Sequence, residues 1–152
     1  MIRSSTERSY NIMKELFTNL ITINTKPEAI QNVLKNPQRL LEWIPEIQSV
    51  KAGENHFHIR RISSALNQLE VLSVTTTTDS ITYHSTKGRL EYDLVFKLTG
   101  ADDQTIVAQT LLLKSKTPLS LPAGLLAPIA KHAFKQNLNG LKNLVEVLAY
   151  QD

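Results

Sequence analysis

The 152-residue chain contains no cysteine, and this absence removes several classes of chemistry. There is no disulfide framework, no thiolate nucleophile, no cysteine-ligated zinc site and no iron–sulfur cluster. Glycine is also scarce, at five residues, roughly half of the ~7% that is usual in proteins. Gly53, Gly88 and Gly100 fall in expected strand turns, where a positive φ is the plain explanation. A phosphate-cradling loop is therefore not expected, and no Walker or dinucleotide-binding motif occurs.

Long apolar runs are missing too. No stretch approaches the ~18 apolar residues of a membrane-spanning helix, and the N-terminus lacks the apolar core of a signal peptide. We therefore expect a cytoplasmic location. The composition that remains, 41% apolar and 20% charged, is that of a globular protein. We expect one domain over residues 1–152, with residues 1–15 as a short helix or a loose N-terminal arm.

Positive charge is concentrated near the C-terminus. The net charge is only +3, and five lysines beyond residue 103 account for the excess. Such an end could face nucleic acid or an anionic membrane, but this footprint is small, so nucleic-acid binding is not expected. The plain interpretation is a solvated helix face, and the alternative is a surface that docks a protein partner. The lysines of the expected C-terminal helix are Lys131, Lys135 and Lys142.

The period of the hydrophobic pattern divides the chain. Residues 17–23 read as a strand and residues 25–34 as a helix, with Thr25 as its cap and one face formed by Ile30, Val33 and Leu34. A second short helix is expected over residues 37–43. Six strands joined by tight turns follow, and the last element is a long amphipathic helix over residues 125–149. The six strands are expected at residues 47–52, 56–63, 68–77, 81–86, 90–99 and 105–115.

This order predicts an α+β fold in which a curved seven-stranded antiparallel sheet grips the C-terminal helix, with two short helices after the first strand. A bent sheet cannot follow a helix everywhere, so a space is left between them, and that space is the expected ligand site. Gly140 lies inside the long helix, where glycine is unfavourable, and indicates close approach of the sheet or a bend.

Two segments carry a resemblance to a known family. Residues 21–50 contain a strand, a Pro-Glu helix start, an Asn-Pro break and a Trp-x-Pro corner, and residues 137–144 (Asn-Leu-Asn-Gly-Leu-Lys-Asn-Leu) lie in the long helix. Both resemble the helix-grip superfamily (SRPBCC), which includes START domains, the birch-pollen allergen group and the polyketide cyclase/dehydrase group. The resemblance implies a cavity for an apolar or amphipathic small molecule. It carries over no catalytic residue, metal or cofactor.

Strand alternation and helix phase give a set of candidate cavity residues. Arg61 alternates with Phe57 and Ile59, so it is expected either to meet an anionic ligand or to reach water at the strand end. Trp43 is expected to plug the short helices against the sheet, to form a cavity wall, or both. The full set is Trp43, Phe57, Ile59, Arg61, Tyr83, Ser85, Tyr92, Leu94, Phe96, Leu126, Ile129, Ala130 and Phe134.

Two further pairs have side chains that could carry chemistry. His56 and His58 share a strand face and could bind zinc or copper, but exposed strand histidines without a metal are the simpler expectation. Glu91 and Asp93 also share a face, which we expect to point to solvent because the opposite face of that strand is apolar.

Three functions remain open. The first is binding or transport of a hydrophobic small molecule or lipid. The second is a cyclase- or dehydratase-like enzyme in the same cavity, using groups from Arg61, Tyr83, His84, Ser85 and Tyr92. The third is a protein-interaction module that uses the lysine face. Residues 117–128, apolar and flanked by lysines, are expected to contact a membrane, to cover the cavity, or to fold back on the core.

Overall fold

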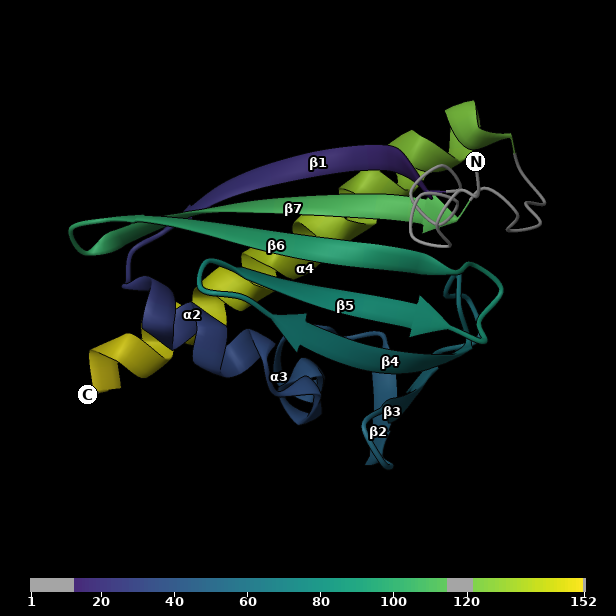
Figure 1. Ribbon diagram of the computed structural model, residues 1–152, viewed down its shortest axis with the longest axis horizontal. Coiled ribbons are helices and arrows are strands. Elements are labelled where there is room, and N and C mark those ends of the chain that lie inside the picture. The colour runs from purple at the N-terminus through teal and green to yellow at the C-terminus, as the bar shows by residue number, and fades with distance from the viewer. Residues whose placement is uncertain (1–12, 115–121, 152) are drawn as a thin grey trace, which may run out of the picture.

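The computed structural model describes residues 13–114 and 122–151. Within these residues, seven strands form one antiparallel sheet in the order β1-β7-β6-β5-β4-β3-β2, so β1 pairs with β7. The long helix α4 runs diagonally across one face of the sheet (Figure 1). The expected α+β architecture is therefore confirmed. The strands are β1 (Met13–Ile23), β2 (Ile47–Ala52), β3 (Phe57–Arg61), β4 (Leu69–Thr76), β5 (Ser80–Thr86), β6 (Tyr92–Ala101) and β7 (Gln104–Lys114). The helices are α2 (Pro27–Leu34), the 3-10 turn η1 (Pro37–Arg39), α3 (Leu40–Trp43) and α4 (Ala123–Gln151).

Strand β6 shows how the sheet makes its core. Tyr92, Leu94, Phe96 and Leu98 are buried in alternation with more exposed neighbours, as the period-2 pattern predicts. Phe96 has no exposed surface, and burial of such a side chain contributes about 1.5–3 kcal/mol. The apolar face of the sheet packs on α4, so the alternation decides which side chains lie near a cavity.

Helix α2 begins at Pro27 and buries Ile30, Val33 and Leu34, the face that the sequence predicts. The expected cap is wrong. Lys26 precedes the helix without a side-chain cap, and the proline at its start supplies a pre-set φ. Thr25 contacts β7 instead: its backbone carbonyl accepts a hydrogen bond of 2.7 Å from the hydroxyl of Thr105.

Strand β1 is longer than expected. It begins at Met13 rather than at residue 17, and the added residues pair with the end of β7, with a register shift between Glu15 and Phe17. Met-Lys-Glu has little β propensity, so the sequence pattern missed it. Pairing with β7 determines the backbone there.

The turns use residues other than glycine for left-handed backbone. Within the described residues, Asn55, Lys87 and Asp102 have positive φ, and no glycine does. The expectation for the turn glycines is therefore wrong, because asparagine and aspartate tolerate this region. Gly100 is required by a close contact instead, since a Cβ there would lie 2.6 Å from Cγ of Pro27.

Gly140 marks another close contact. A Cβ at this position would lie 2.6 Å from the carbonyl oxygen of Trp43. The partner is thus the short helix α3, not the sheet. The glycine lets α4 pack directly on the corner that follows α3.

The lysine face of α4 covers an edge of the sheet. Lys135 donates a hydrogen bond to the carbonyl of Leu20, and Lys142 donates one of 2.8 Å to the carbonyl of Thr22, both on the free edge of β1. Glu146 accepts a hydrogen bond of 2.9 Å from the backbone N–H of Asn24. Unpaired backbone groups at the edge of a sheet can pair with a strand of another molecule. Here the side chains of α4 bond the backbone groups of β1 instead. In the described parts of the chain, no helix is long and apolar enough to cross a membrane.

Candidate functional site

A cavity of about 230 Å³ lies between α4 and the sheet. Its sheet wall includes Leu16, Leu111 and Leu113, and its helix wall includes Ala133 and Phe134. The loop between β3 and β4 closes one side. Leu66 in this loop and Ile129 on α4 line the cavity and are themselves exposed, so the cavity reaches the surface. We call this space the outer chamber.

A second space of about 20 Å³, the inner chamber, lies next to it. The two chambers share four lining residues, which are Arg61, Tyr92, Phe134 and Asn137. Trp43 and Gln109 line the inner chamber but not the outer one. About 10–15 Å³ in this measure holds one water molecule, so the inner chamber takes one small group. The outer chamber offers an apolar wall, and the inner chamber lies at its polar end.

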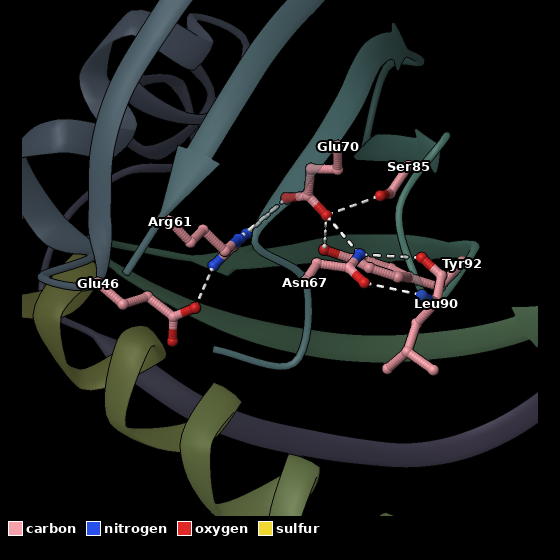
Figure 2. Close-up of polar contacts among 7 residues, drawn as sticks. All are labelled: Glu46, Arg61, Asn67, Glu70, Ser85, Leu90 and Tyr92. Carbon is pink, nitrogen blue, oxygen red and sulfur yellow. Dashed lines mark hydrogen bonds and ion pairs between the residues drawn. The ribbon is translucent and has the colours of Figure 1, made fainter. Parts of the chain in front are cut away.

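That polar end is built around Arg61. The guanidinium Nη2 lies 2.8 Å from Oε1 of Glu70, and Nη1 lies 2.9 Å from Oε2 of Glu46. The side chain of Glu70 is fully buried, whereas that of Glu46 is 29% exposed. Arg61 is therefore clamped between two carboxylates, one deep and one near the surface (Figure 2).

Glu70 also collects three donors on its other oxygen. Oε2 accepts hydrogen bonds from Asn67 at 2.8 Å, from Ser85 at 2.8 Å and from Tyr92 at 3.1 Å (Figure 2). Asn67 in turn bonds the backbone of Leu90, as donor at 2.9 Å and as acceptor at 2.7 Å. The network thereby ties the β3–β4 loop to the start of β6.

These contacts set the charge states. Burial alone would raise the pKa of Glu70, but the charge of Arg61 and the donated hydrogen bonds outweigh it and hold the pKa below its usual range. Burial, together with the nearby charge of Glu70, raises the pKa of Tyr92 well above its usual value, so the phenol keeps its proton. With formal charges, one arginine and two carboxylates leave the network at −1.

The structure changes the interpretation of Arg61. Its anionic partners are Glu46 and Glu70, so it neither awaits a ligand anion nor simply reaches water. The side chain is 9% exposed. Because two carboxylates of the protein already compensate the charge of this guanidinium, an acidic ligand would gain little from it.

The other predicted cavity residues divide into three groups. Tyr92 and Phe134, like Arg61, line both chambers. Ile129 and Ala130 line the outer chamber, whereas Trp43, Tyr83 and Leu94 line the inner one. The remaining five line neither chamber: Phe57, Ile59, Ser85, Phe96 and Leu126. Ile59, Ser85, Phe96 and Leu126 are packed in the interior. Ser85 nevertheless reaches the site through Glu70.

The opposite face of the sheet holds the histidine and carboxylate pairs. His84 joins Asp93 at 2.9 Å through Nδ1 and Thr75 at 2.9 Å through Nε2. The Nε2 atoms of His56 and His58 lie 3.2 Å apart. Among the described residues, no group of three or more histidine, aspartate or glutamate side chains could hold a metal ion. Of residues 117–128, the segment 117–121 lies outside the described residues.

Sequence reasoning missed several polar residues of the site. Glu70 shares the buried face of β4 with Leu72, and Gln109 shares the buried face of β7 with Val107 and Leu111. A polar residue in phase with buried apolar ones was the available signal. Glu46 and Asn67 lie outside regular strands, so no periodicity could have indicated them.

Comparisons with known proteins find the fold but not a sequence family. No protein-family model matches the chain, and no curated protein matches it. Among solved structures, it is similar to a START superfamily protein from Mycobacterium smegmatis, with TM-score 0.74, 14% identity and coverage of 89% of this chain and 99% of that one. The ZhuI aromatase/cyclase from Streptomyces sp. R1128 gives TM-score 0.70 at 13% identity, covering 88% and 94%.

A third structure, from Thermus thermophilus, gives TM-score 0.65 at 18% identity, covering 89% and 99%. In all three cases the match covers 88–89% of this chain and 94–99% of the other. The chain has the helix-grip fold of a START superfamily protein and of an aromatase/cyclase.

Proposed function

We propose that this protein binds a hydrophobic or amphipathic small molecule, a lipid included, in the two chambers between the sheet and α4. The observation that carries the proposal is the outer chamber, a space of about 230 Å³ with leucine, alanine and phenylalanine walls that reaches the surface. Ligand sites are typically concave and mostly apolar, with a few placed polar groups. The Arg61–Glu70 network and Gln109 provide the polar groups here.

Catalysis in the same cavity is the second candidate, because one protein of this fold is by name an aromatase/cyclase. The geometry favours binding. Arg61, Ser85 and Tyr92 are bonded to Glu70, and Tyr83 donates its hydroxyl hydrogen to the carbonyl of Leu34. His84 bonds Thr75 and Asp93 on the other face of the sheet. Each of these five side chains, which are the candidates for catalysis from the sequence, is thus engaged by the chain itself.

Filling the outer chamber tests the proposal. Ala133→Trp places an indole in the space that a ligand would take, and Ala149→Trp adds the same indole at an exposed position of the same helix. Purified wild-type protein is extracted and the extract analysed by mass spectrometry, and affinity for an apolar fluorescent probe is titrated. We expect Ala133→Trp to weaken binding at least tenfold and Ala149→Trp to leave it unchanged. An empty extract together with no probe binding would overturn the proposal.

A further inference from the structure

Gln109 ends in a hydrogen-bond donor that the chain does not use. Its side chain is fully buried on the inner face of β7 and lines the inner chamber. Its amide nitrogen Nε2 has no hydrogen-bond partner among the described residues. Buried donors are almost always paired, so an unpaired one needs an explanation, and a partner that enters from the chamber is such an explanation.

The orientation of this amide is determined by its neighbours. Asn19 Nδ2 donates to Oε1 of Gln109 at 3.1 Å and to the carbonyl oxygen of Lys131 at 3.0 Å. A backbone carbonyl can only accept, so the NH2 end of Asn19 must face it. The oxygen of Gln109 must then face Asn19, which leaves its Nε2 turned away. A flipped amide would set two N–H groups against each other.

A second donor lies in the same wall. The indole Nε1 of Trp43 is buried without a hydrogen-bond partner in the described part of the chain, and Trp43 lines the inner chamber with Gln109. Indole nitrogen only donates. The chamber is therefore bordered by donors that lack acceptors.

Charge and size restrict what can supply the acceptor. The carboxylates of the network exceed its guanidinium by one formal charge, because Arg61, which lines both chambers, is paired both with Glu46 in the wall of the outer chamber and with the buried Glu70. A carboxylate or phosphate on a ligand would approach this negative charge and lose its hydration. The inner chamber also has room for about one water-sized group. A single neutral oxygen meets both conditions.

We propose that the ligand is an uncharged apolar molecule with a neutral acceptor oxygen, a ketone, ester or ether, whose oxygen enters the inner chamber and accepts a hydrogen bond from Gln109. Its apolar body fills the outer chamber. This inference rests on the proposed function and adds the ligand class. It makes Gln109 the residue that determines specificity.

Three probes of one shape test the inference. 2-Acetonaphthone carries the ketone, 2-isopropenylnaphthalene replaces the ketone oxygen with CH2, and 2-naphthoate replaces the methyl ketone with a carboxylate. Affinities for the wild-type protein are measured by isothermal titration calorimetry. We expect the ketone to bind about tenfold more tightly than the alkene, the worth of one net hydrogen bond, and the carboxylate to bind most weakly. The side-chain amide resonance of Gln109 should shift with the ketone and not with the alkene.

Variants give the second arm. Gln109→Leu should remove the preference for the ketone over the alkene, whereas Gln104→Leu, an exposed glutamine of the same strand, should keep it. Equal affinity for ketone and alkene in the wild-type protein, or tightest binding of the carboxylate, overturns the inference and leaves cavity binding in place. Failure of all three probes, with an empty extract, overturns both. If Gln109→Leu does not fold, the affinities of the wild-type protein for the three probes still test the inference.

Discussion

Arg61 and Glu70 form a buried ion pair at the junction of β3 and β4, with Nη2 2.8 Å from Oε1. The backbone is held in place on both sides of the pair, because the N–H of Arg61 donates to the carbonyl of Gln68 at 2.8 Å and Glu70 pairs with Ile59 across β3 and β4. Neither side chain is more than 9% exposed. A pair of this kind is costly to bury and still more costly to break.

Removal of one partner should therefore destabilise the fold strongly. We expect Arg61→Leu to lower the free energy of unfolding by about 3–5 kcal/mol, because Glu70 is left charged in the interior. Urea denaturation followed by circular dichroism measures this loss. Arg39→Leu breaks the exposed pair with Glu42 and should cost less than about 1 kcal/mol. A small loss for Arg61→Leu would show that Glu70 does not need its partner.

The same pair predicts a pH dependence. The folded-state pKa of Glu70 lies below the ordinary value of 4.5, so the stability it contributes is present above the unfolded pKa and is lost as pH falls through the folded one. We expect the urea midpoint to hold near neutral pH and to fall below about pH 4.5. Glu70→Gln should have a lower urea midpoint than the wild type at pH 7, and its midpoint should fall less as the pH is lowered below about 4.5. A variant whose midpoint falls as steeply as that of the wild type would contradict this assignment.

Gly140 and Gly124 give a matched comparison on α4. Alanine in place of glycine inside a helix usually stabilises it by up to about 1 kcal/mol. At Gly140 the new Cβ would press on the carbonyl of Trp43, so we expect Gly140→Ala to destabilise the protein by about 1–3 kcal/mol. At Gly124 nothing lies within 4 Å, and Gly124→Ala should be neutral or stabilising. Thermal melts show whether each substitution raises or lowers the stability. A change in the same direction for both variants would contradict the close contact at Gly140.

The lysines of α4 predict protection of β1. Lys142→Met removes a hydrogen bond to Thr22 and an ion pair of 2.7 Å with Glu146. We expect a loss of about 0.5–1.5 kcal/mol and faster amide hydrogen exchange in β1. Lys131→Met, an exposed lysine of the same helix, is the control. Unchanged exchange in β1 would mean that the edge does not depend on this contact.

The sequence predicted the order of elements because period-2 and period-3.6 patterns are local. The face Ile30, Val33 and Leu34 of α2 and the alternation of β6 are cases in point. The partners of Arg61 were not accessible in this way, since Glu46 lies 15 residues before it and Glu70 nine after it. Their meeting depends on how the α3–β2 corner and the β3–β4 loop come together. Likewise, Gly140 could be recognised as unusual, but only the fold shows that Trp43 is its reason.

The pairing of β1 with β7 has a consequence for synthesis on the ribosome. Thr18 and Thr110 are bonded side by side but lie 92 positions apart in the chain. At about 5–20 residues per second, β1 waits on the order of 5–20 s before its partner strand emerges. Contacts of such sequence separation also slow folding, because the loop between them must close first. Strand β1 is thus made before the other six strands of the sheet, and its apolar residues lack their partner strand until β7 has been synthesised.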